Sequence, residues 1–415
     1  MGPPTLLHPF ARPTAERFIP IVRGEGAAVF DADGRRYVDG LASLWYCNVG
    51  HGRAEIIDAV TQQMRQIENY NLFDIFTNEP ADRLAERVAA LSPVPDARVF
   101  LTCSGSEAVD TALKLARLTF QRSGQPQRQV VVSRTLGYHG TNMGGTALQG
   151  LPLNRTGWGR LLDGIETVPH DDLEAAGELF AARGGEIAAV VAEPVIGAGG
   201  VHPAAPGYLA GLRNLCDEHG ALLVFDEVIT GFGRLGAWFA AAAAGVTPDM
   251  ITFAKAVTSG YQPLGGVVVG PRVRVAIEDD DSFVLRHGYT YSGHPTACAA
   301  ALANLDLLRD DGLLDRVPHI AERLGGGLRH LHEQGPVAAV RGEGAIWAVE
   351  VPTGTDAVAV RDAMLARGVI ARPIGATTVA FCPPLVIDDD DLDLCVGALG
   401  EALAEVAPAG RPAPA

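Results

Sequence analysis

The segments LLVFDEV, at residues 222–228, and MITFAK, at residues 250–255, each join an apolar run to charged residues. A short, continuous apolar run is typical of a strand that is buried in a sheet. Asp226 and Lys255 would then lie where two such strands end. We expect Lys255 to be partly buried there, and burial lowers the pKa of an amine because it disfavours the charged form.

These two residues suggest a particular chemistry. An amine with a lowered pKa is a nucleophile that forms a Schiff base with an aldehyde. An aspartate held nearby is the partner that a pyridinium nitrogen requires. Taken singly, each residue has a simpler explanation, since a lysine at a strand end usually extends its head group into solvent and Asp226 could be an ordinary loop carboxylate. Further residues are needed to decide.

Short apolar runs alternate with helical patterns between residues 98 and 270. The runs are Arg98–Thr102, Gln129–Ser133, Ile187–Ala192, Ala221–Phe225, Met250–Phe253 and Gly265–Val269. This alternation predicts an α/β fold with a mostly parallel sheet covered by helices on both faces. Ligands of such sheets bind at the carboxyl ends of the strands, where Lys255, Asp226, Glu193 and the turn 103–106 would meet.

Local patterns predict further elements. Val29–Val38 carries Asp-Ala-Asp-Gly between apolar positions, which indicates a hairpin. Apolar residues at helical spacing predict helices over Ala81–Leu91 and Glu107–Phe120. The alanine-rich tract Ala237–Gly245 predicts a tightly packed helix, and Pro295–Leu308 predicts a long one.

The pattern changes from about residue 295 onward, to helices and short strands that end near Leu403. We interpret this part as a smaller α+β domain that the N-terminal segment joins. The predicted division is a large domain over residues 46–294 and a small domain formed by residues 1–45 and 295–415. The Pro-rich residues 406–415 are expected to be a disordered tail.

Composition excludes several function classes. The net charge is −16, from 33 basic and 49 acidic residues, with no basic cluster, which argues against nucleic acid and anionic membrane surfaces as partners. No apolar run is long enough to span a membrane, and we see no signal peptide. The six cysteines have neither C-x-x-C nor zinc spacing, so we expect buried thiols, no metal site and a cytoplasmic location.

The sequence TCSGSEA, at residues 102–108, links a predicted strand to a predicted helix. Free backbone amides at a helix start, together with small hydroxyls, form a site for an anion such as phosphate. The simpler explanation is that Ser104 or Ser106 only caps the helix. A second glycine-rich stretch, G-x-G-x-x-G at residues 231–236, follows Asp226 and Glu227, which are poor neighbours for a pyrophosphate, so we disfavour a dinucleotide site there.

Three more residues have two explanations each. Tyr138 could stack on a flat heterocycle or pack in a loop. His139 could titrate or be a satisfied structural histidine. Thr290 could bind a phosphate or serve a turn.

Seven stretches taken together resemble the class III, pyridoxal-phosphate-dependent aminotransferases, and within them the ω-transaminases. They are residues 41–52, 104–108, 138–140, 193–200, 226–234, 254–266 and 287–295. The resemblance runs from about Leu7 to Leu403. It implies the fold type I of pyridoxal-phosphate-dependent transferases, with a mostly parallel seven-stranded sheet in the large domain and a smaller α+β domain.

The resemblance implies roles for the residues around the expected cofactor. Lys255 would hold pyridoxal phosphate as a Schiff base and then move the proton between substrate carbon and cofactor. Asp226 would keep the pyridine nitrogen protonated. Val228 and Tyr138 would pack on the two ring faces, with His139 also in contact with the cofactor.

The remaining cofactor contacts involve the phosphate and the phenolic oxygen. Gly105 and Ser106 would bind the phosphate, and Glu193 would lie near the phenolic oxygen. Thr290 would reach the phosphate from a partner subunit, which implies a homodimer with shared active sites.

The resemblance also points to the substrate pocket. Trp45 matches an aromatic pocket wall of ω-transaminases, although a core tryptophan is the alternative, and Phe73 and Tyr46 would line the same pocket. Arg372 matches the arginine that binds a substrate carboxylate, although a solvated strand arginine is the alternative. At Ala198 the chain departs from the γ-aminobutyrate and ornithine branches, which carry a glutamate there, so we expect a bulkier or uncharged amine donor.

The sequence therefore predicts an aminotransferase that moves an amino group from an amine or ω-amino acid to an α-keto acid, with pyruvate as the expected acceptor. A decarboxylase, racemase or aminomutase of the same fold is the alternative. An aminotransferase that tailors a secondary metabolite is the second alternative. A non-catalytic cofactor-binding protein is disfavoured, because Lys255, Asp226, Glu193 and Arg372 are all present.

Overall fold

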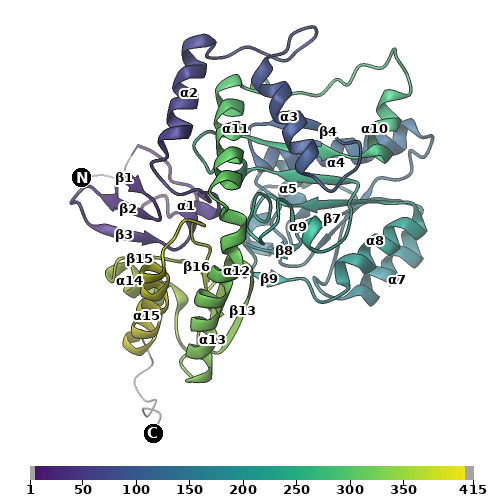
Figure 1. The fold of residues 1–415 in the computed structure, drawn as a ribbon. Coiled ribbons are helices and arrows are strands. Elements are labelled where there is room, and N and C mark those ends of the chain that lie inside the picture. Colours follow the sequence, from purple (N-terminus) through teal and green to yellow (C-terminus); the bar gives the residue numbers. More distant parts are fainter. Residues whose placement is uncertain (1–4, 407–415) are drawn as a thin grey trace.

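The computed structural model describes residues 5–406 of the 415-residue chain (Figure 1). Its centre is a seven-stranded sheet in the order β4-β12-β11-β10-β7-β5-β6. The strands are β4 (Arg98–Thr102), β5 (Val130–Arg134), β6 (Ile165–Val168), β7 (Ile187–Ala192), β10 (Leu222–Asp226), β11 (Met250–Phe253) and β12 (Gly265–Val269). β12 runs antiparallel to both of its neighbours, and the pairs from β11 to β6 are parallel. The predicted mostly parallel sheet is confirmed.

Helices cover both faces of this sheet because the side chains of a strand alternate between its faces. Leu222 and Val224 of β10 belong to a buried cluster with α4, whereas Leu223 and Phe225 belong to one with α8. The helices of this region are α4 (Gly105–Arg122), α5 (Met143–Leu148), α6 (Pro152–Arg155), α7 (Leu173–Arg183), α8 (Tyr208–His219), α9 (Ala240–Ala243) and α10 (Pro271–Glu278). The short strands β8 (Val195–Ile196) and β9 (His202–Pro203) pair beside the sheet.

Two smaller sheets lie beside the large one (Figure 1). The first contains β1 (Ile21–Glu25), β2 (Ala28–Asp31), β3 (Arg36–Asp39) and β15 (Val369–Ile370). The second contains β13 (Ala339–Glu343), β14 (Ile346–Glu350), β16 (Arg372–Ile374) and β17 (Thr378–Phe381). In the first sheet Val369 pairs in parallel with Val38, so the N-terminal and C-terminal segments share a sheet. The exact domain boundaries stay a prediction.

The remaining helices pack around these sheets. They are α1 (Ala42–Trp45), α2 (Ala54–Gln66), α3 (Glu79–Leu91), η1 (Lys255–Val257), α11 (Pro295–Asp310), η2 (Leu313–Arg316), α12 (Val317–Ile320), η3 (Ala321–Gly325), α13 (Gly326–Glu333), α14 (Ala357–Ala366) and α15 (Asp389–Val406). Figure 1 shows α11 standing between α2 and α3, and it packs against both of these helices. The described part of the chain contains no helix that is both long and apolar enough to cross a membrane.

Most of the predicted elements are confirmed, and two points are corrected. The helices α3, α4 and α11 and the β2–β3 hairpin lie at the predicted positions. The alanine-rich tract, however, forms only the single turn α9, because residues with left-handed backbone, Gly236 and Gly245, flank it. The edge strand β6 was not predicted, because its sequence Ile-Glu-Thr-Val has polar residues between the apolar ones and so forms no continuous apolar run.

The six cysteines are free thiols, and five of them are buried, in agreement with the prediction. Within residues 5–406 no group of three or more His, Cys, Asp or Glu side chains could hold a metal ion. Residues 407–415 of the predicted disordered tail lie outside the described residues, and Val406 is the last residue of α15.

Candidate active site

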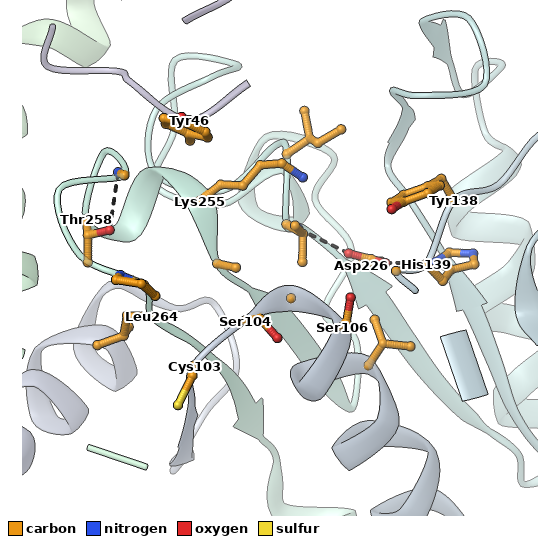
Figure 2. A pocket seen from close by; sticks show the side chains of 18 of the residues that line it. Tyr46, Cys103, Ser104, Ser106, Tyr138, His139, Asp226, Lys255, Thr258 and Leu264 are labelled. Atoms are coloured by element: carbon orange, nitrogen blue, oxygen red, sulfur yellow. Dashed lines mark hydrogen bonds and ion pairs between the residues drawn. The ribbon is translucent and has the colours of Figure 1, made fainter. Parts of the chain in front are cut away.

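A cavity of about 370 Å³ lies at the carboxyl ends of β10 and β11 and at the start of α4 (Figure 2). The residues that line it are Tyr46, Cys103, Ser104, Gly105, Ser106, Val109, Tyr138, His139, Gly140, Glu193, Asp226, Val228, Ile229, Ala254, Lys255, Thr258, Gly260, Gln262, Pro263 and Leu264. This is the edge of the sheet at which a ligand was expected. The strand order brings together residues that are far apart in the sequence.

Lys255 projects into this cavity from the turn that follows β11. Its backbone has φ of 49°, in the left-handed region that non-glycine residues seldom adopt. Such strain persists only where the surrounding structure holds it, and it is common at functional sites. Burial lowers the pKa of Lys255, and the carboxylates of Asp226 and Glu193 oppose this shift. Lys255 is thus partly buried at the end of β11, as predicted.

Asp226 ends β10, and both of its carboxylate oxygens accept hydrogen bonds. His139 Nδ1 lies 2.8 Å from Asp226 Oδ2, and the Val228 amide donates to Oδ1 over 3.2 Å. Asp226 is 4% exposed and His139 is 2% exposed, so water does not compete with this pair. The carboxylate is therefore fixed in direction (Figure 2).

Glu193 is buried directly after β7 and holds two loops of the site. Its Oε1 accepts a hydrogen bond from the Tyr138 amide at 2.9 Å, and its Oε2 accepts one from the Gly197 amide at 3.0 Å. Burial raises the pKa of Glu193, while His139 opposes the shift. Glu193 thus fixes the position of Tyr138, whose own pKa is raised by burial.

The start of α4 forms a second polar wall of the cavity. Ser104 is the N-cap and accepts from the Glu107 amide at 3.2 Å, while Glu107 Oε2 accepts from the Cys103 amide at 2.7 Å. The arrangement is a variant of the capping box, in which the Glu107 side chain returns to the amide before the N-cap instead of to the N-cap amide itself. The first amides of the helix, at Gly105 and Ser106, have no partner within the helix and are free to bind an anion. Ser104 therefore caps the helix, as in the simpler explanation, without occupying the anion site.

Two glycines let this wall approach its neighbours closely. A Cβ at Gly105 would lie 3.0 Å from the Val228 side chain, and a Cβ at Gly140 would lie 2.6 Å from Ser106 Oγ. Ser106 Oγ also accepts a hydrogen bond from the Thr141 amide at 3.0 Å. The absence of side chains at these two positions therefore allows the start of α4 to pack directly against Val228 and the loop at Gly140.

Tyr46 lines the cavity, and Trp45 does not. Trp45 is 2% exposed and packs in a buried cluster with Ile229, Ala380 and neighbouring apolar residues. This position in the core fits the alternative of a core tryptophan, and the pocket-wall role of Trp45 stays a prediction. The Tyr46 ring rests against the backbone of Gly260, where no side chain would fit beside it.

The other predicted substrate and phosphate residues lie outside the cavity wall. Arg372 is half-buried on β16, and burial lowers its pKa while the nearby Tyr138 opposes the shift, so it is not a freely solvated arginine. Ala198 is half-buried in the loop after β8. Phe73 is 48% exposed and packs against the backbone of Gly288, and Thr290 is exposed on the same segment.

Sequence reasoning missed several residues of the cavity wall. Thr258, Gly260, Gln262 and Leu264 all line it, and they lie directly after Lys255 in the sequence. These residues belong to the stretch 254–266, which carries part of the family resemblance. That stretch was the signal from which they could have been predicted.

Comparison with known proteins supports the geometric picture. The sequence profile of the family "Aminotransferase class-III" matches residues 10–403. A β-alanine–pyruvate aminotransferase from Pseudomonas aeruginosa is 36% identical, over 93% of this chain and 92% of its own length. An ω-aminotransferase from Caulobacter vibrioides is 36% identical, over 90% and 91%. The structure of an amine transaminase from an uncultivated Pseudomonas species, in its PLP-bound form, has a TM-score of 0.93 at 35% identity and covers 97% and 99% of the two chains.

Proposed function

Because the chain belongs to the class III aminotransferases, which are pyridoxal phosphate enzymes, we propose that it transfers an amino group from an amine or ω-amino acid to pyruvate. Amino-group transfer from an amine donor to a keto acid is the activity of this family. The choice of pyruvate rests on relatives that are named for it. The observation that carries the proposal is Lys255, an amine with a lowered pKa that faces Asp226 across the cavity.

The residues of the cavity fit pyridoxal phosphate. The amides of Gly105 and Ser106 suit its phosphate, Asp226 suits its ring nitrogen, and Lys255 suits its carbonyl carbon. Val228 lines the same cavity and offers an apolar side chain to a flat ring. When bound, the cofactor supplies an electron-withdrawing ring and a carbonyl carbon that takes up the amino group.

We assign the catalytic roles to the residues of this chain as follows. Lys255 would hold the cofactor through its amine and, as the free amine, would accept a proton from the donor carbon. Its lowered pKa favours the neutral amine, which is the form that can accept this proton. Asp226 would place its negative charge beside the ring nitrogen. The orientation of the Asp226 carboxylate is fixed by His139 and by the Val228 amide.

The remaining cofactor contacts are proposals of the same kind. Tyr138 and Val228 would contact the two ring faces, and Glu193 would lie near the phenolic oxygen. The hydrogen bond that Glu193 accepts from the Tyr138 amide would hold the tyrosine in place for this contact. Tyr138 and Glu193 both line the cavity.

We propose that the donor pocket extends from Tyr46 in the cavity wall toward Ala198 and Arg372, which lie outside that wall. Arg372 would pair with the carboxylate of pyruvate, since a half-buried guanidinium gains most from an anionic partner. Ala198 leaves space where a glutamate would compete for this arginine. We therefore infer a bulky or uncharged amine as the preferred donor.

We further propose a homodimer with shared sites. Phe73, which packs beside Gly288, and Thr290 are both exposed and lie outside the cavity of their own chain, so they are available to complete the site of a second copy. The six free cysteines suit the reducing environment of the cytoplasm, which we propose as the location.

One experiment separates this proposal from a racemase, decarboxylase or aminomutase of the same fold. The holoenzyme is mixed with an amine donor alone, and the cofactor spectrum is followed. An aminotransferase converts the cofactor to its amine form and stops until pyruvate is added, whereupon alanine appears. Turnover without pyruvate, with the spectrum unchanged at the end, would refute transamination. A screen in which larger donors react better than simple amines would favour a role in tailoring secondary metabolites.

A further inference from the structure

Asp39 is a buried carboxylate that neither the cofactor nor the substrate contacts account for. It is the last residue of β3 and is 1% exposed. Its Oδ2 accepts hydrogen bonds from the Ser43 amide at 2.6 Å and from His51 Nε2 at 2.9 Å, and its Oδ1 accepts from the Leu41 amide at 3.3 Å. One carboxylate thus binds the chain at three points around the segment 41–46, which we call the Tyr46 loop.

The Tyr46 loop has an unusual backbone. Ala42, Ser43 and Trp45 all have left-handed φ values, of 47°, 59° and 69°. None of them is glycine, and each side chain is strained in this region, so neighbouring contacts must hold the conformation in place. The Leu41 and Ser43 amides that Asp39 binds flank the first of these strained residues.

The backbone of His51, which binds Asp39 through its ring, is itself held in place by hydrogen bonds. It exchanges two hydrogen bonds with Gly26, from the His51 amide at 2.8 Å and from the Gly26 amide at 3.1 Å. The ring is therefore anchored to the segment between β1 and β2. Asp39 connects this anchored ring to the Ser43 amide through a single oxygen.

The conformation of the Tyr46 loop decides which aromatic side chain reaches the cavity. Trp45 turns into the core, and Tyr46 turns toward Lys255 and rests on Gly260 (Figure 2). A loop that relaxed to ordinary φ values would move both rings. The wall of the donor pocket thus depends on a carboxylate that does not itself line the cavity.

We propose that Asp39, supported by His51, is a positioning residue that holds the Tyr46 loop in its strained conformation and so sets the wall of the donor pocket. The effect on the donor rests on the proposed function, whereas the effect on the loop does not. The two parts are therefore measured separately.

The first measurement is hydrogen–deuterium exchange of the holoenzyme, which needs no substrate. In Asp39→Ala, exchange of the amides in residues 41–46 is expected to rise about tenfold, the change that corresponds to the loss of one hydrogen bond. The control is Asp391→Ala, which removes the ion pair of Asp391 with Arg36, 2.6 Å long, at the other end of the same strand. This control should leave the exchange of the Tyr46 loop unchanged.

The second measurement uses benzylamine as donor and pyruvate as acceptor. Asp39→Ala should raise KM for benzylamine about tenfold, with little change in kcat and in the cofactor content, and Asp391→Ala should change neither constant. A general loss of stability would lower cofactor content and kcat instead. If benzylamine were not turned over by the wild type, that would count against the proposed function, and the exchange result would still decide the role of Asp39.

A second variant covers the case in which Asp39→Ala does not fold. His51→Phe keeps a ring of similar shape but removes the donor to Asp39, so exchange of the Tyr46 loop should rise by a smaller factor, in the same residues. Unchanged exchange of residues 41–46 in whichever variant folds, or an equal rise in Asp391→Ala, would overturn the proposal.

Discussion

His139 and Asp226 form a buried hydrogen bond of 2.8 Å between two strand ends that are 87 residues apart in the sequence. His139 follows β5, and Asp226 is the last residue of β10. The bond joins the turn that carries Tyr138 to the strand that carries the proposed partner of the cofactor nitrogen.

Replacing His139 by Phe should weaken cofactor binding about tenfold or more, because a buried acceptor that loses its donor costs about 1–3 kcal/mol. The measurement is the dissociation constant of pyridoxal phosphate from the refolded apoenzyme. His319→Phe is the matched control, since His319 pairs with Asp389 at 2.7 Å on the surface, where such pairs contribute little. Equal effects in the two variants would contradict a specific role for His139.

Gly260→Ala should raise KM for the amine donor, because the added Cβ would displace the Tyr46 ring. Gly260 has φ of 79°, so the substitution also costs about 1 kcal/mol of stability from backbone strain. Gly335→Ala carries the same strain, with φ of 96°, but its Cβ would meet no neighbour. Both variants should unfold more easily, and only Gly260→Ala should change donor KM. A similar KM in both would show that Tyr46 does not form the pocket wall.

The free energy of unfolding should fall as the pH rises from about 4.5 to about 7, because Glu227 loses its proton in this range. Burial raises the pKa of Glu227 from 4.5 to about 7, against the opposing effect of its hydrogen bonds from the Ala240 and Ala241 amides and Thr230. The native protein therefore holds this proton more tightly than the unfolded chain, and raising the pH through this window costs up to about 3 kcal/mol. The measurement is the free energy of unfolding in urea at pH 5 and pH 8.

In Glu227→Gln this contribution is absent, so the loss of stability between the two pH values should be smaller than in the wild type. The amide side chain still offers one acceptor to the helix start at Ala240. An identical pH dependence in the two proteins would mean that Glu227 is already ionised at pH 5.

Arg372→Leu should raise KM for pyruvate about tenfold or more, the loss expected for one charge-assisted contact. The KM of an uncharged amine donor should stay nearly constant, because Leu retains the apolar stem of the side chain. The measurement is alanine formation at varied concentrations of each substrate. A larger effect on the donor than on pyruvate would show that Arg372 serves the other half-reaction.

Much of the fold was predictable because buried strands of a parallel sheet are continuous apolar runs. All six of these strands lie within one residue of the predicted positions. The edge strand β6 lacks such a run and was missed. Likewise Lys255 and Asp226 could be predicted, since each follows a run directly.

The sequence indicated that Tyr46 lines the cavity, but it could not show that the neighbouring Trp45 packs in a buried cluster. That packing depends on left-handed φ values at Ala42 and Ser43, residue types that seldom adopt them, and on the distant contacts of Asp39. Tertiary contacts of this kind have no local sequence signal.

The most direct test of the account is covalent attachment of the cofactor to Lys255. The holoenzyme is reduced with borohydride, digested and analysed by mass spectrometry, alongside Lys255→Ala. We predict a pyridoxyl group on Lys255 of the wild type, none on the variant, and an activity lowered about 10²- to 10⁴-fold or more in the variant, as for loss of a proton-transferring group. A labelled residue other than Lys255, or full activity of Lys255→Ala, would contradict the account.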